Sequence, residues 1–262
     1  MDQKDCPILV FDSGMGGISV LREIVRLMPE ENYIYYGDSA NAPYGTKDMS
    51  QVRRLTISCV EEMVEKYHIK AAAIACNTAT SAAVRILRGM YPAMPIVGVE
   101  PAVKPAVMAE DHARILVMAT PFTLKEQKFH DLEERYSDRA SIIPLPCPGL
   151  MEFVEAGILG GEELDSFLHK LLDPYRGKDL TGIVLGCTHY PFLRNAIRKV
   201  VGPSIEIYDG GYGTAKELRR RLDQAGLRKT DSGEPGNLEF LNSSDDPVLI
   251  TRSKMLFSHP EL

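Results

Sequence analysis

Two cysteines lie in matching surroundings and are the first candidates for chemistry in this chain of 262 residues. Cys76 follows an apolar run and precedes Asn77 and Thr78, and Cys187 follows a second apolar run and precedes Thr188. In both places a helix is expected to begin just after the cysteine. The unpaired N–H groups and the positive dipole end of a helix N-terminus favour a thiolate there.

Two such thiols could work as an acid and a base on one carbon. Inverting a stereocentre that bears an acidic C–H requires a base on one face and an acid on the opposite face. A cysteine pKa of about 8.5 leaves a minor but useful fraction of thiolate near neutral pH. Thiol and thiolate can exchange roles at each turnover, so Cys76 and Cys187 predict a reversible racemisation that needs no cofactor.

The other three cysteines, Cys6, Cys59 and Cys147, are interpreted as structural, because free cysteines are commonly buried as small hydrophobic residues. Five cysteines without a CxxC pair fit reduced thiols in the cytoplasm better than a disulfide framework or a zinc site. The six histidines show no paired ligand spacing, so no metal is implied.

Polar neighbours could adjust the thiols and bind the acidic groups of a substrate. Asp12, Glu155 and His189 are candidates for the first task, although a helix cap, a surface charge and a loop hydrogen bond would explain them separately. Loops that enter helices present hydroxyl and N–H groups to anions, and helix capping alone would explain many of those residues. The loop from Ala42 to Gly45 could supply a lid or a backbone donor, and a plain turn is the simpler interpretation. The candidates for binding anions are Ser13, Asn77, Thr78, Thr120, Thr123 and Thr188.

Short apolar runs alternate with longer amphipathic segments along the chain. Ile8–Phe11 reads as a strand, the spacing of apolar residues from Ile18 to Met28 is helical, and Tyr33–Tyr36 reads as a second strand. This alternation predicts an α/β fold with mostly parallel strands and helices on both faces of the sheet. The pattern continues with helices over 50–67 and 79–90 and strands over 71–75 and 96–99.

A faint duplication suggests two similar α/β units. The run at Ile115 lies 107 residues after the run at Ile8, and Cys187 lies 111 residues after Cys76. Ligands bind at the carboxyl ends of the strands in open α/β sheets, so two facing units would enclose a ligand between the two cysteines. After residue 227 the chain turns polar, and a surface extension with one short strand near Leu238–Leu241 is expected.

Composition excludes several functional classes. A net charge of −6, with no basic cluster beyond Arg219–Arg221, argues against a nucleic-acid partner. No apolar run reaches the length of about 18 residues that a transmembrane helix needs, so no membrane contact is expected. The first apolar run is far too short for the core of a signal peptide.

Six motifs resemble the glutamate racemase family: FDSGMGG (11–17), YGDSANAPYG (36–45), ACNTAT (75–80), CPGLMEFVEAG (147–157), GCTHYP (186–191) and YDGGYGTA (208–215). The resemblance covers about residues 8–215, and the two cysteine motifs together are highly specific. It implies two pseudo-symmetric domains, 1–99 with 209–262 and 100–208, and an active site in the cleft between them. Gly210 stands where a serine is common in the family.

The resemblance also implies the activity and the site. Members interconvert L- and D-glutamate without a cofactor and supply D-glutamate for peptidoglycan. Cys76 and Cys187 would be the acid/base residues, with Asp12 beside the first and Glu155 and His189 assisting the second. Members commonly dimerise, so a homodimer is one assembly that the resemblance allows. The implied substrate-binding residues are Asp12, Ser13, Tyr44, Gly45, Asn77, Thr78, Thr120, Thr123, Thr188 and His189.

Three alternatives stay open. A relative of the same fold could racemise aspartate or another small acidic compound, because the sequence does not measure the length of the pocket. A cysteine-nucleophile hydrolase, with His189 activating a thiol, would explain one cysteine and leave the other idle. A non-catalytic amino-acid binding module would tolerate the loss of both thiols.

Overall fold

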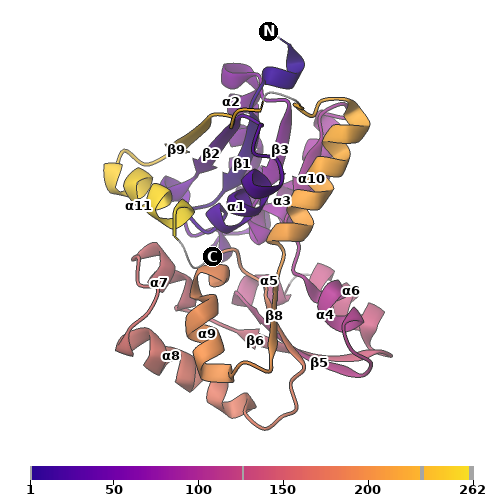
Figure 1. Ribbon diagram of the computed structural model, residues 1–262, viewed down its shortest axis with the longest axis vertical. Helices are drawn as coiled ribbons and strands as arrows, with labels where there is room; N and C mark the ends of the chain where they lie inside the picture. Colours follow the sequence, from indigo (N-terminus) through magenta and orange to yellow (C-terminus); the bar gives the residue numbers. More distant parts are fainter. Residues whose placement is uncertain (1, 126, 231–232, 260–262) are drawn as a thin grey trace. The chain divides into compact units, whose positions relative to one another are not determined.

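A computed structural model describes residues 2–125, 127–230 and 233–259 (Figure 1). The chain divides into two compact units, Met1–Glu100 with Gly211–Ser258, and a second unit built on Pro101–Gly210. Each unit has one parallel sheet with helices packed against it, which confirms the predicted α/β class. Within the described residues, no helix combines the length and the apolarity needed to cross a membrane.

The sheet of the first unit has the order β4-β3-β1-β2-β9, and all its pairings are parallel. Every residue of the central strand β1 is buried, as expected for a strand covered on both faces. Its strands are β1 (Ile8–Asp12), β2 (Tyr33–Gly37), β3 (Ala71–Ile74), β4 (Ile96–Gly98) and β9 (Leu238–Asn242).

Helices cover this sheet in two groups. Leu9 and Phe11 of β1 share an apolar cluster with α2 (Met49–Tyr67) and α3 (Asn77–Met90). The remaining long helices pack together, because α1 contacts both α10 and α11. These three are α1 (Ile18–Leu27), α10 (Gly211–Ala225) and α11 (Pro247–Phe257). Three 3₁₀ turns complete the unit: η1 (Gln3–Asp5), η2 (Ser39–Asn41) and η3 (Tyr44–Thr46).

The segment after residue 227 does more than extend over the surface. Its predicted short strand is present as β9, which pairs in parallel with β2 from Tyr33↔Leu238 to Gly37↔Asn242. The helix α11 follows, and its Leu256 is fully buried. The expected strand is thus confirmed, and its side chains are only partly buried, whereas the helix α11 was not predicted.

The second unit repeats the strand order of the first. Its sheet runs β6-β5-β7-β8, so β5, β6, β7 and β8 take the places that β1, β2, β3 and β4 take in the first sheet. The register agrees with this equivalence, because Val117 of β5 pairs with Val184 of β7 as Val10 of β1 pairs with Ala73 of β3. The strands are β5 (Ala113–Ala119), β6 (Ala140–Pro146), β7 (Gly182–Leu185) and β8 (Glu206–Asp209).

An apolar cluster joins β5 of this sheet to α4 and α6. The short helix α7 packs against η5, and α8 packs against α9. The helical elements are α4 (Val103–Met108), α5 (Pro121–Lys125), α6 (Gln127–Tyr136), α7 (Leu150–Glu155), α8 (Glu162–Leu172), η4 (Asp173–Tyr175), η5 (Tyr190–Leu193) and α9 (Arg194–Val201).

Candidate active site

Cys76 lies at the point where β3 passes into α3, as the sequence predicts. It is the N-cap residue of α3, with an extended backbone, and Asn77 and Thr78 form the first turn. The thiol is 7% exposed, and its Sγ lies 3.4 Å from Oγ of Ser13, which is within hydrogen-bond distance for sulfur. Residues from the ends of two neighbouring strands, β1 and β3, are therefore brought together here.

Asp12 ends β1 and is fully buried next to the strand that leads to Cys76. Its Oδ2 accepts a hydrogen bond of 2.9 Å from the N–H of Gly14. Gly17 makes this close packing possible, because a Cβ there would lie 2.7 Å from Cβ of Asp12 and 2.9 Å from Cβ of Ala75. The last glycine of the FDSGMGG motif thus serves the packing of the Asp12 loop against the end of β3.

Tyr44 and Gly45 lie in η3, on the loop that follows β2. The Tyr44 side chain is buried, and its hydroxyl donates a 2.6 Å hydrogen bond to Oδ2 of Asp38. Burial raises the pKa of Tyr44, and the hydrogen bond and charge of Asp38 raise it further. The Tyr44 hydroxyl is therefore occupied by its hydrogen bond to Asp38. The groups of this loop that can bind a ligand are the backbone N–H groups of Tyr44 and Gly45.

Cys187 begins a line of three polar groups in the second unit. Its Sγ lies 3.6 Å from Nδ1 of His189, and Nε2 of His189 lies 2.6 Å from Oε1 of Glu155 on α7. Burial alone would lower the pKa of His189, but its hydrogen bonds to Cys187 and Glu155 outweigh burial and hold that pKa well above its ordinary value. An imidazolium between a carboxylate and a thiol stabilises the thiolate.

The helix that was expected directly after Cys187 begins later. A turn follows the cysteine, then η5, and α9 begins only at Arg194. Pro191 lies in the first turn of η5, where a proline is tolerated because its missing N–H would have no partner there. The turn is fixed by the buried Tyr190, whose N–H donates to the carbonyl of Cys187 and whose hydroxyl donates to the carbonyl of Cys147. His189, rather than a helix N-terminus, is thus the positive group beside this thiol.

The remaining candidates of the second unit gather at the same edge of its sheet. Thr120 follows β5, and its Oγ1 lies 3.0 Å from Oγ1 of Thr123 and accepts a 3.2 Å hydrogen bond from the N–H of Thr123. Thr188, 7% exposed, directly follows Cys187. Gly186 lets β5 and β7 approach here, because a Cβ at this position would lie 2.9 Å from Cβ of Ala119.

Each unit therefore holds its own group of predicted residues at the carboxyl ends of its strands. The first group is Asp12, Ser13, Tyr44, Gly45, Cys76, Asn77 and Thr78. The second group is Thr120, Thr123, Glu155, Cys187, Thr188 and His189. Each group contains one cysteine at the end of an equivalent strand, with hydroxyl groups beside it.

The other cysteines have different surroundings. Burial raises the pKa of Cys59 to about 12, and burial together with the nearby Cys187 raises the pKa of Cys147. Cys147 also donates its S–H to the carbonyl of Leu145 at 3.2 Å. Both thiols keep their protons near neutral pH. Among the residues that the structure describes, no group of three or more His, Cys, Asp or Glu side chains could hold a metal ion.

Asp38 was not singled out from the sequence, yet it is the buried carboxylate that binds Tyr44. It follows Gly37, which pairs in register with Asp12, so the two aspartates lie at the carboxyl ends of neighbouring strands. The sequence does show each of them at the end of an apolar run.

The Asp/Glu/hydantoin racemase family model matches residues 8–218 of the chain. The chain belongs to this family. The glutamate racemase of Clostridium botulinum is 49% identical to it over 256 residues, which cover 98% of each chain. As a family member the chain is an isomerase.

Two solved structures of this family resemble the chain over nearly its whole length. The structure of Francisella tularensis glutamate racemase in complex with D-glutamate has a TM-score of 0.82 at 25% identity, and covers 97% of this chain and 94% of its own. The structure of Escherichia coli glutamate racemase with L-glutamate and the activator UDP-MurNAc-ala has a TM-score of 0.81 at 30% identity, and covers 95% of each chain.

Proposed function

We propose that this chain interconverts L- and D-glutamate with Cys76 and Cys187 as its two acid/base residues. The observation that carries the proposal is the equivalence of the two cysteines, which follow β3 beside β1 and β7 beside β5. The relatives described above carry the name glutamate racemase, and two of their structures hold L- or D-glutamate. This supports glutamate over aspartate as the substrate.

In the proposed reaction, one cysteine enters each turnover as a thiolate and the other as a thiol. The thiolate removes the proton from Cα, and the electron pair of the C–H bond remains as a carbanion delocalised into the neighbouring carboxylate. The thiol then donates its proton to the opposite face of Cα. The product leaves the two sulfurs in exchanged protonation states, ready for the reverse reaction. The mechanism requires both thiols to reach the Cα of one substrate.

The surrounding residues supply electrostatic support for the thiolates. At Cys187 the His189 imidazolium balances the thiolate, and Glu155 fixes the ring and its charge. At Cys76 the Ser13 hydroxyl and the first turn of α3 favour the thiolate, with Asp12 beside them. The substrate's carboxylates bind hydroxyl and backbone N–H donors from Asn77, Thr78, Tyr44, Gly45, Thr120, Thr123 and Thr188.

In the wider proposal, the two units correspond to domains 1–99 with 209–262 and 100–208. The enzyme works in the cytoplasm, where it supplies D-glutamate for peptidoglycan.

The test is the incubation of the purified chain with L-glutamate, and separately with L-aspartate, followed by chiral chromatography. We expect D-glutamate to approach an equal mixture with L-glutamate, and far slower formation of D-aspartate. Activity should survive exhaustive chelation and need no added pyridoxal phosphate. A faster reaction with aspartate would reverse the assignment of substrate, and a strict requirement for a metal or pyridoxal phosphate would exclude the two-cysteine mechanism.

A further inference from the structure

The loop that carries Tyr44 and Gly45 is organised around one buried carboxylate. Asp38 directly follows β2 and is 1% exposed. Its Oδ2 accepts the 2.6 Å hydrogen bond from the Tyr44 hydroxyl, and its Oδ1 accepts a 3.0 Å hydrogen bond from Nδ2 of Asn41. Both oxygens thus bind side chains of the loop that begins at Asp38 itself.

We infer that Asp38 is a positioning residue of the active site, which holds the Tyr44–Gly45 backbone where it binds substrate. This inference rests on the proposed function. Hydrogen bonds to a carboxylate are stronger and shorter than those between neutral groups. The ring of Tyr44 is held against Phe11 of β1, with ring centroids 6.4 Å apart. The place of the Tyr44 and Gly45 peptides therefore depends on the hydroxyl that Asp38 binds.

The start of the loop after β2 is also fixed by contacts with the loop after β1. The N–H of Asp38 donates a 2.9 Å hydrogen bond to the carbonyl of Asp12. Gly37 lies against the loop after β1, because a Cβ there would lie 2.5 Å from the carbonyl oxygen of Gly14. Through these contacts the loop after β2 takes its position from the loop that carries Asp12 and Ser13.

The end of β9 supplies the third support. Nδ2 of Asn242 donates to Oγ of Ser39 at 2.9 Å, and the N–H of Ala40 donates to Oγ of Ser243 at 3.0 Å. The N–H of Ser243 also donates to the carbonyl of Gly37 at 3.0 Å. With its base fixed in this way, the part of the loop that Asp38 controls is the stretch from Asn41 to Gly45.

The test is a double-mutant cycle with Asp38→Asn, Tyr44→Phe and the double variant, assayed by the racemisation of L-glutamate. Asparagine has the shape of aspartate but no charge, so the contact with the Tyr44 hydroxyl becomes a weaker hydrogen bond between neutral groups. We expect KM to rise about tenfold or more in each single variant, with kcat within about threefold, because the loop binds substrate and transition state alike. In the double variant KM should match the worse single variant, since Asp38→Asn weakens the same contact that Tyr44→Phe removes.

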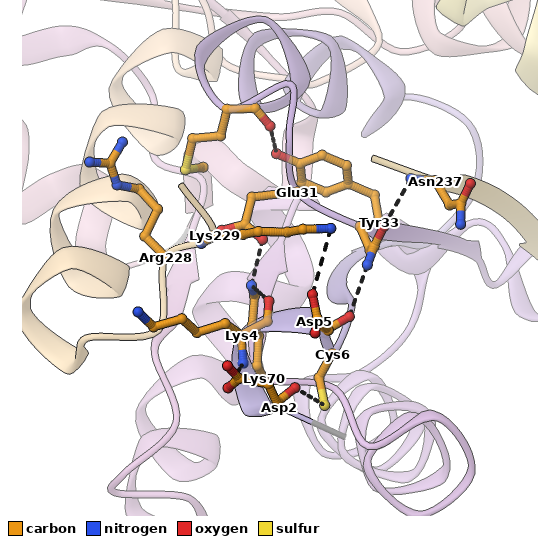
Figure 2. Close-up of polar contacts among 12 residues, drawn as sticks. Asp2, Lys4, Asp5, Cys6, Glu31, Tyr33, Lys70, Arg228, Lys229 and Asn237 are labelled. Atoms are coloured by element: carbon orange, nitrogen blue, oxygen red, sulfur yellow. Dashed lines mark hydrogen bonds and ion pairs between the residues drawn. The ribbon is translucent and has the colours of Figure 1, made fainter. Parts of the chain in front are cut away.

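Glu31→Gln is the matched control. Glu31 is a fully buried carboxylate of the same unit, near η1, where it binds Nζ of Lys70 at 2.5 Å and the N–H of Lys229 at 2.8 Å (Figure 2). It lies in the turn before β2, at the opposite end of that strand from Asp38. This variant should lower the melting temperature and leave KM and kcat unchanged.

An unchanged KM in the single variants would overturn the positioning role. So would a KM in the double variant that rises by the product of the two single effects. A fall in melting temperature with no change in KM, as in the control, would also overturn it. If Asp38→Asn does not fold, Tyr44→Phe carries the test, because it removes a single hydroxyl group. A wild-type protein that leaves L-glutamate unchanged overturns the proposed function. An active wild type with unaffected variants overturns only the role of Asp38.

Discussion

The imidazole of His189 bridges Glu155 and Cys187, with Nε2 2.6 Å from the carboxylate oxygen and Nδ1 3.6 Å from the sulfur. A carboxylate lies on one side of the ring and a thiol on the other. The protonation of His189 therefore depends on both neighbours. The pKa of His189 is raised by both hydrogen bonds against the opposing effect of burial. Glu155 therefore acts on the charge of the ring that lies beside Cys187, without touching the sulfur itself.

Glu155→Gln should reduce kcat/KM for glutamate about tenfold to a hundredfold, because it removes the charge that keeps His189 protonated. Since the equilibrium constant of a racemisation is one, kcat/KM must fall equally in both directions, while kcat alone can become unequal. Steady-state kinetics from each enantiomer would measure this. Glu152→Gln, an exposed position on the same helix, should behave as wild type. If the Glu155→Gln variant shows wild-type kinetics, the Glu155 side chain has no role in the reaction.

The raised pKa of His189 also predicts how stability depends on pH. A folded-state pKa above the unfolded value of about 6.5 adds stability that is complete below that value and is lost as the pH rises through the folded pKa. The melting temperature of wild type should therefore exceed that of His189→Gln most at about pH 6, and the difference should narrow at alkaline pH. Thermal unfolding of both proteins across this range checks it. A difference that widens with pH would mean that burial determines the pKa.

Cys76→Ser and Cys187→Ser should each reduce racemisation by at least about a hundredfold while the fold is retained, because serine is a far weaker base at neutral pH. In deuterated water the wild-type product should carry deuterium at Cα. Cys6→Ser serves as the control, since this buried cysteine lies near η1, away from both groups of site residues. Full turnover in either active-site variant, or a product that keeps its original hydrogen, would contradict the two-base reaction.

Gly17→Ala should destabilise the protein by about 1–3 kcal/mol, because the added methyl group overlaps Cβ of both Asp12 and Ala75. It should also reduce activity, since these neighbours carry the Asp12 and Cys76 loops. Gly89→Ala is its counterpart: this helical position has no atom within 4 Å of an added Cβ, so alanine should stabilise by about 0.5–1 kcal/mol. Urea unfolding of the two variants measures both effects, and equal stabilities would show that the Asp12 loop can move aside.

Local patterns in the sequence predict the central strands and the start of α3 well, because each is set by neighbouring residues. Buried apolar runs give β1 and β3, and the polar residues after Cys76 mark the N-terminus of the helix. At Cys187 the same reasoning placed the helix too early, because a turn and the 3₁₀ helix η5 come between the cysteine and the start of α9 at Arg194.

Contacts between distant segments were harder to predict. The hydrogen bond from Tyr44 to Asp38 depends on how the loop folds back on itself, although both residues stand within the YGDSANAPYG motif. The pairing of β9 with β2 joins residues about 200 positions apart, and edge strands that bury few side chains carry a weak pattern.

The discontinuity of the first unit has a consequence for protein synthesis. Residues 101–210 are contiguous and can fold as they leave the ribosome, whereas α1 must wait for α10 and α11, and β2 must wait for β9. Until then the nascent chain exposes the apolar side of α1 and an unpaired strand edge, which are the features that chaperones recognise and that promote aggregation. The emergence of β9 from the ribosome, rather than the completion of the two cysteine loops, is thus the event that completes the first sheet.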